Sequence, residues 1–154
     1  MDRLQRYLIG ILLILLVAGL VLVRLMLDLN DLRRQENTQQ VIERVARQVE
    51  MFREARGSLP MELNDFALEV PEGFSDAEGD PIDAWGNYIL YYRVGRGRDE
   101  HYMIASPGRD GNFDHPPHQY LGHRSFSSNR GHPDRDTVLV GGRLVQGPEE
   151  AGQR

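Results

Sequence analysis

The chain contains no cysteine. Disulfide bonds and thiol chemistry are therefore excluded, although a periplasmic protein can fold without bridges, so this absence does not fix the compartment. The 154 residues carry a net charge of -5, which gives no electrostatic support for nucleic-acid binding. Signatures of hydrolases, zinc proteases, phosphate loops and dinucleotide sites are also missing from the sequence. We therefore expect neither an enzyme nor a protein with a small-molecule substrate.

The stretch from Tyr7 to Val23 lacks charges, amides and proline. Apolar residues resume after Arg24 and continue to Leu27. About 20 helical residues are needed to span a bilayer core of ~30 Å. Because every backbone polar group in hydrocarbon must be satisfied within the segment, the stretch must be helical. The sequence predicts a transmembrane helix over residues 7–27, preceded by residues 1–6 as a cytoplasmic N-terminus or leader.

A cleaved secretory signal is the alternative interpretation of this stretch, with Arg3 and Arg6 as its basic region. The apolar run is long for a signal, and no small-x-small site ends it. Arginines flank both ends of the run, so the positive-inside rule favours neither orientation strongly. The short N-terminal flank and the polar remainder favour a single-pass protein with its N-terminus inside and residues 28–145 outside.

Helical periodicity continues from residue 25 to about residue 56. After a polar patch at 33–40, apolar residues recur at spacings of three and four: Val41, Ile42, Val45, Ala46, Val49 and Phe52. This stripe is typical of a helix that packs one face on a sheet, and no heptad pattern is long enough for the alternative, a coiled coil. Gly57 suits the C-terminal cap and Pro60 the stop. The anchor and a spine helix at 36–56 can form one helix, or two with a break near residues 30–31.

The remaining chain predicts short elements separated by turns. Pro60 suits the first turn of a short helix, and the aromatic and β-branched residues near Tyr91 indicate a strand. The expected elements are a helix at 60–68, an acidic loop at 70–81, a strand at 88–94, a hairpin turn at 95–99, a strand at 101–105, a loop at 115–133, a last strand or small hairpin at 137–145 that turns at Gly141-Gly142, and a disordered tail at 146–154. We therefore expect an α+β fold with a small antiparallel sheet within residues 85–145.

Several segments occur in a recognisable order and spacing. They are Gly57-Ser-Leu-Pro, Leu63, Asp83-Ala-Trp-Gly-Asn, Tyr91-Tyr92, Tyr102-Met-Ile-Ala-Ser-Pro-Gly-Arg-Asp-Gly and Asp134-Arg-Asp-Thr-Val. Over most of residues 40–145 the chain resembles the major (G-type) pseudopilin family of type II secretion. The resemblance implies a type IV pilin-like fold, in which a half-transmembrane spine helix precedes a short helix and a C-terminal sheet with a calcium-holding loop.

The resemblance also implies a calcium site at the base of the long loop. It places Asp110, Asp134 and Asp136 around one ion, together with carbonyls near Ala105 and Ser106. Asn112 and Asp114 are further candidates in the same turn. Calcium prefers six to eight hard oxygen ligands, which such residues offer. The alternative is that the Asp and Asn side chains only shape turns and that residues 134–136 form a solvated charge cluster.

The N-terminus departs from the family pattern. Prepilins carry a basic leader that ends in Gly, followed by a hydrophobic residue and a Glu at the fifth mature position. Gly10-Ile11 fits the cleavage pattern, but the fifth position is then Leu15. A leucine cannot offset the charged N-terminus of a neighbouring subunit in a low-dielectric bundle. Either the chain is processed and assembled without that contact, or it stays an unprocessed anchored domain.

Four histidines lie in the loop at 115–133. They are His115, His118, His123 and His132. Neutral imidazoles can bind zinc, but their spacing matches no recognised zinc pattern and no cysteine assists them. We interpret the segment as a flexible, His-rich insertion.

Two hypotheses about function follow. In the first, the protein is a pseudopilin-like structural subunit of a type II secretion or type IV pilus-like system, in the inner membrane with a periplasmic C-terminal domain. Its partners would be the membrane and other subunits, and small residues at Ala18 and Gly19 would help helices associate. In the second, it is a membrane-anchored accessory or binding domain that does not polymerise.

Overall fold

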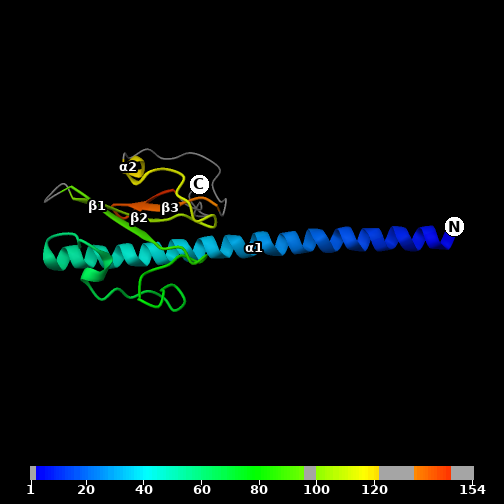
Figure 1. Ribbon diagram of the computed structural model, residues 1–154, viewed down its shortest axis with the longest axis horizontal. Coiled ribbons are helices and arrows are strands. Elements are labelled where there is room, and N and C mark those ends of the chain that lie inside the picture. Colours follow the sequence, from blue (N-terminus) through cyan, green and yellow to red (C-terminus); the bar gives the residue numbers. More distant parts are fainter. Residues whose placement is uncertain (1–2, 96–99, 122–133, 147–154) are drawn as a thin grey trace. The chain divides into compact units, whose positions relative to one another are not determined.

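The computed structural model describes residues 3–95, 100–121 and 134–146 (Figure 1). The chain divides into two compact units, Met1–Arg33 and Arg34–Arg154. Its elements are α1 (Arg3–Arg56), the 3-10 turn η1 (Leu63–Asp65), β1 (Leu90–Val94), β2 (His101–Ser106), α2 (Pro117–Tyr120), β3 (Thr137–Val140) and β4 (Arg143–Gln146). A long apolar N-terminal helix and a small antiparallel sheet make this the predicted α+β arrangement.

In the first unit, α1 presents apolar side chains that no other part of this unit covers. Every large apolar side chain described between Tyr7 and Leu29 is more than half exposed. An 18-residue window of this helix has a mean hydropathy of 2.8. The helix is therefore long and apolar enough to cross a membrane, as the sequence predicts.

Helix α1 runs without interruption to Arg56, so the alternative of two helices with a break at residues 30–31 is excluded. Gly57 adopts a φ of 74°, and its N–H donates to the carbonyl of Arg53 at 2.8 Å. This left-handed conformation is open to glycine at no steric cost, which confirms the predicted cap. Arg53 and Arg56 lie in the last turn, where a positive charge interacts favourably with the helix dipole.

The second unit contains a four-stranded antiparallel sheet in the order β1-β2-β3-β4. Leu90 of β1 pairs with Ala105 of β2, and Ala105 pairs in turn with Val138 of β3. β3 and β4 form a hairpin that turns at Gly141 and Gly142, with φ values of 53° and 80°. The small hairpin is therefore confirmed, and a single last strand is excluded.

Both faces of the sheet are covered. Because side chains alternate between the two faces of a strand, each strand can contribute residues to both hydrophobic clusters. Tyr102, Ile104 and Leu139 pack on the C-terminal half of α1, together with the predicted stripe, whose buried members are Val41, Ile42, Val45, Ala46 and Val49. Met103, Ala105, Val138 and Val140 face the other way and pack against Tyr120 of α2. Figure 1 shows the labelled strands between the two helices of this unit. This double coverage explains why β3 is buried along its whole length.

Two polar residues of α1 are buried although the sequence places them in a polar patch. Gln35 is 1% exposed and Thr38 is fully buried. The Thr38 hydroxyl accepts a hydrogen bond from the backbone N–H of Ala84 at 3.0 Å. The buried surface of α1 therefore begins before Val41 and holds the turn that starts at Asp83.

The predicted helix at 60–68 is wrong, since only Leu63–Asp65 forms a 3-10 turn. The Asp65 carboxylate accepts the backbone N–H groups of Met61, at 2.6 Å, and Glu62, at 3.1 Å, and so closes a single turn. Phe66 is extended, with φ -144° and ψ 164°. The segment therefore leaves the helical conformation after one turn.

Three smaller expectations also change. The strand predicted at 88–94 begins at Leu90, while Tyr88 forms an isolated bridge with Ile82. The loop predicted at 115–133 contains the one-turn helix α2, and Gln146, predicted to begin the tail, ends β4. Residues 96–99 of the hairpin turn, 122–133 of the long loop and 147–154 of the tail lie outside the described residues.

Candidate functional site

The base of the distal loops is organised around Asp83, which is 1% exposed. Its Oδ1 accepts the backbone N–H groups of Trp85, at 2.9 Å, and Asn87, at 2.8 Å. Its Oδ2 accepts the hydroxyl of Ser106 at 2.6 Å and the side-chain amide of Asn87 at 3.3 Å. Four donors therefore satisfy both oxygens, as a buried carboxylate requires.

The same network joins the turn after Asp83 to the turn after β2. The Asn87 amide also donates to the Gly108 carbonyl at 2.7 Å, and the Gly108 N–H donates to the Ser106 hydroxyl at 3.1 Å. Gly111 adopts a φ of +70°, and a Cβ there would lie 3.1 Å from Oδ1 of Asn87. Segments 83–87 and 102–111, two of those on which the family resemblance depends, are thus bound to each other directly.

Asp134 lies at the other side of the loop base and pairs with Arg109. Nε of Arg109 lies 2.5 Å from Oδ1 of Asp134, and Nη2 lies 3.0 Å from Oδ2. This two-point geometry is the strongest arrangement of an arginine and a carboxylate. Both oxygens of this predicted calcium ligand therefore already have a cationic partner.

Asp136 is fully buried beside Tyr120. Its Oδ2 accepts the Tyr120 hydroxyl and, at 3.0 Å, the backbone N–H of Asp114. Its Oδ1 has no hydrogen-bond partner among the described residues. Burial raises the pKa of the Asp136 carboxyl to about 6, although the bond from Tyr120 opposes this rise. Burial also raises the pKa of Tyr120, which keeps its hydroxyl protonated as a donor.

The structure also describes the other predicted ligands. Asp110 is exposed, and its Oδ1 accepts the N–H of Asn112 at 3.0 Å. Asp114 approaches Arg135 at 3.9 Å. Ala105 is buried within β2, and Ser106 engages Asp83.

The donor set fits a calcium ion in part. Oδ1 of Asp136 is a buried oxygen that lacks a donor, which a cation would satisfy. Asp134, in contrast, would have to exchange Arg109 for the ion. Within residues 3–95, 100–121 and 134–146, no group of three or more His, Asp or Glu side chains is gathered as a metal site. Calcium binding stays a prediction.

Two of the four histidines can be placed. The backbone N–H of His115 donates to the Tyr120 hydroxyl at 3.0 Å, and the two rings lie 5.8 Å apart. His118 is exposed in α2. His123 and His132 lie outside the described residues, so the zinc hypothesis is not tested.

The residues predicted for processing lie in the exposed apolar part of α1. Gly10 and Ile11 are both exposed, and a Cβ at Gly10 would meet no atom within 4 Å. Leu15 is 63% exposed, like its apolar neighbours. The cleavage prediction depends on the leader sequence, which this geometry leaves untested.

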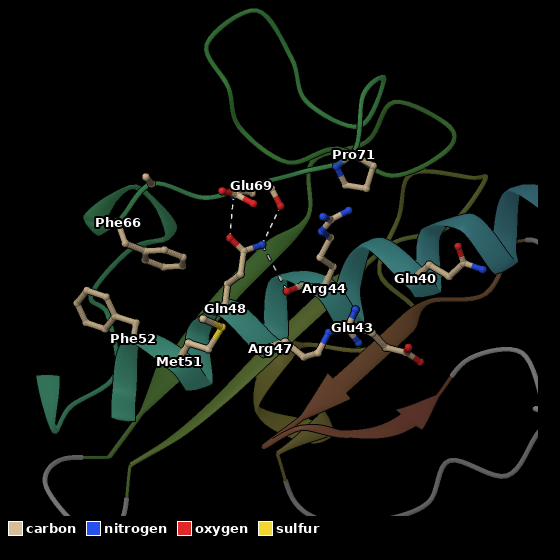
Figure 2. Close-up of a pocket in the computed structure, with 11 residues that line it drawn as sticks. Gln40, Glu43, Arg44, Arg47, Gln48, Met51, Phe52, Phe66, Glu69 and Pro71 are labelled. Atoms are coloured by element: carbon tan, nitrogen blue, oxygen red, sulfur yellow. Dashed lines mark hydrogen bonds between the residues drawn. The ribbon is translucent and has the colours of Figure 1, made fainter. Parts of the chain in front are cut away.

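A groove on the second unit was not predicted. It lies between α1 and the segment 66–71, and its lining includes Arg44, Arg47, Met51 and Phe66 (Figure 2). Its signal in the sequence was weak, because exposed arginines on a helix normally face only solvent. The roles of Asp83 and Tyr120 were also missed; the segment Asp83-Ala-Trp-Gly-Asn suggested a strand start but not a buried carboxylate.

Comparison of the chain with protein-family models, with curated proteins and with solved structures gave no match.

Proposed function

We propose that the protein is a pseudopilin-like structural subunit of a type II secretion or type IV pilus-like system. It would assemble through its N-terminal helix and help to move folded proteins across the outer membrane. In this proposal the helix lies in the bacterial inner membrane, the unit Arg34–Arg154 lies in the periplasm, and the loop base holds calcium.

One observation carries the proposal most strongly. The N-terminal part of α1 exposes a continuous apolar surface, and the part of the same helix beyond Arg34 is the spine of an antiparallel sheet domain. Exposed apolar surface of this extent requires lipid or other helices as partners. A helix that is an anchor at one end and a domain core at the other is the design that the resemblance to pseudopilins implies.

A second candidate function is favoured by Leu15. An apolar side chain there cannot form the charge contact that joins neighbouring pilin N-termini. A membrane-anchored accessory domain that does not polymerise needs no such contact. The two candidates differ in whether subunits associate into chains of more than two.

Cross-linking within the membrane separates these candidates. The chain has no cysteine, so introduced thiols would be unique. Cysteines at Ala18 and Leu20 lie about 200° apart around the helix, because each residue of an α-helix advances by about 100°. We expect membranes that carry the double variant A18C/L20C to give, on oxidation, a ladder of trimers and larger species.

The single variant Ala18→Cys is the matched control and should stop at dimers, since each chain then forms one disulfide. Absence of a ladder from the double variant, in membranes where the secretion system is assembled, would contradict the fibre proposal and favour the accessory domain.

A further inference from the structure

Helix α1 cannot fill a bilayer with its uncharged run alone. The run from Tyr7 to Val23 is about 25 Å long as a helix, whereas the hydrocarbon core of a bilayer measures ~30 Å. Leu25, Met26 and Leu27 are all more than half exposed, and their inclusion lengthens the span to about 31 Å. A span of sufficient length therefore includes Arg24.

Arg24 has no counter-charge within the part of the chain that the structure describes. Its side chain is exposed on α1, and its guanidinium forms no ion pair or hydrogen bond with a described residue. Asp28 lies one helical turn further on and is also exposed, but no ion pair joins it to Arg24. An isolated charge in hydrocarbon is strongly unfavourable, so the guanidinium requires a partner from its surroundings.

The position of Arg24 along the helix indicates which partner this is. Arg24 lies about 4.5 Å from the end of the span at Leu27, so its long side chain can extend to the level of the lipid headgroups. Phospholipids present phosphate groups at that level, and a guanidinium binds phosphate in a planar, two-point geometry. Asp28 is the first residue beyond the span, and its carboxylate opposes deeper insertion of the helix. A cation just inside the boundary and an anion just outside it together define one depth for α1.

We propose that Arg24 binds the phosphate group of a phospholipid, at the end of the span next to Asp28, and that this contact keeps residues 25–27 inside the bilayer. The inference rests on the membrane placement in the proposed function, and it applies to a fibre subunit and to an accessory domain alike. Without a phosphate partner, Arg24 would be satisfied only in water. Residues 25–27 would then leave the hydrocarbon, and the bilayer would thin around the shorter span.

The test measures how fast a thiol at residue 27 reacts with a membrane-impermeant maleimide. The chain has no cysteine, so Leu27→Cys in the full-length protein is a unique label. The protein is placed in nanodiscs of a phospholipid, or of a glycosyl diacylglycerol with the same acyl chains and no phosphate. We expect labelling to be faster by a factor of about five or more in the phosphate-free lipid, because the shortened span exposes the thiol. With Arg24→Leu added, labelling should be slow in both lipids, since no cation then requires a partner.

Two further positions bound the scale of this measurement. Val17→Cys should react slowly and Asn30→Cys rapidly in both lipids. Slow labelling of Leu27→Cys in both lipids would overturn the phosphate contact, as would an equal acceleration in the Arg24→Leu background.

Two other partners for Arg24 are tested in the same way. If Asp28→Asn makes Leu27→Cys react faster in phospholipid, Asp28 is the partner and the lipid contact is wrong. If inorganic phosphate restores slow labelling in the phosphate-free lipid, the ligand is a free ion, which also overturns the lipid contact. We expect neither effect.

The outcomes also distinguish this contact from the proposed function. If Leu27→Cys with Arg24→Leu reacts rapidly in phospholipid, α1 does not span the membrane through residue 27, and the membrane placement fails together with this contact. If A18C/L20C gives no ladder while the lipid dependence is observed, the fibre proposal fails and the contact of Arg24 stands. Fluorescence of Trp85 in each lipid reports whether the second unit is folded, so that unfolding is not taken for a change in depth.

Discussion

Replacement of Asp83 by alanine is expected to destabilise the second unit by about 3 to 5 kcal/mol, because it leaves several buried donors without acceptors. Asp83 is 1% exposed and accepts four hydrogen bonds, from Trp85, Asn87 and Ser106. Small domains are stable by only about 5 to 15 kcal/mol, so a loss of this size removes much of the total.

Thermal unfolding of the full-length protein in detergent measures this effect. Trp85 is the single tryptophan of the chain and donates its backbone N–H to Asp83, so its fluorescence follows the affected turn. The matched control is Asp80→Ala, in the same region, whose side chain accepts no hydrogen bond from a described residue. We expect the control to change stability by less than about 0.5 kcal/mol. An Asp83→Ala protein as stable as the control would show that the network does not hold the loop base.

Replacement of Asp136 by asparagine, unlike that of Asp83 by alanine, is expected to stabilise the second unit when calcium is chelated. Asp136 is fully buried, one of its oxygens has no partner among the described residues, and burial raises its pKa to about 6. An uncharged amide of the same shape avoids burying the charge. We expect a gain of about 1 to 3 kcal/mol at pH 7, since one pKa unit corresponds to about 1.4 kcal/mol.

The pH dependence of this gain follows from the direction of the pKa change. A carboxyl whose pKa is raised in the folded chain binds protons more tightly there, so stability falls as the pH rises from about 4 to 6. The gain from Asp136→Asn should therefore vanish below about pH 4, where the carboxyl is protonated in both states. A stability equal to that of the unmodified protein at pH 7 would contradict the assignment of an uncompensated buried charge.

Calcium should remove most or all of the stability advantage of Asp136→Asn over the unmodified protein. A ligand present at 100 times its dissociation constant stabilises the folded state by about 2.7 kcal/mol. We expect calcium to stabilise the unmodified protein and to leave Asp136→Asn unchanged. No response of the unmodified protein to millimolar calcium would remove calcium from the account, and the ion pair of Arg109 with Asp134 would then remain as the staple of the loop base.

Local patterns predict those parts of the fold in which one physical effect dominates. The uncharged run from Tyr7 to Val23 leaves no alternative to a helix, and the stripe from Val41 to Val49 is buried as its spacing predicts. The helix expected at 60–68 is replaced by a single turn that the Asp65 carboxylate closes, and the chain beyond this turn is held by a contact that no local pattern contains. Gln48 binds both backbone groups of Glu69 and holds the end of that segment against α1, 21 residues away in sequence.

The candidate site was predicted only where residue type alone indicates chemistry. Asp134 and Asp136 stand out as carboxylates before a strand, but their environments differ through Arg109 and Tyr120, which the fold brings to them. The burial of Gln35 and Thr38 was likewise hidden, because polar residues in a helix are normally solvated. Long-range pairing decides these cases, and a single sequence does not display it.

The most direct test of the central claim is the intact mass of the protein purified from its own membrane. In the prepilins that the chain resembles, the leader is removed before assembly, so the proposed function predicts a chain that begins at Ile11, with a methylated N-terminus. A chain that still carries residues 2–10 would contradict the account, and the protein would then be an unprocessed, membrane-anchored accessory domain.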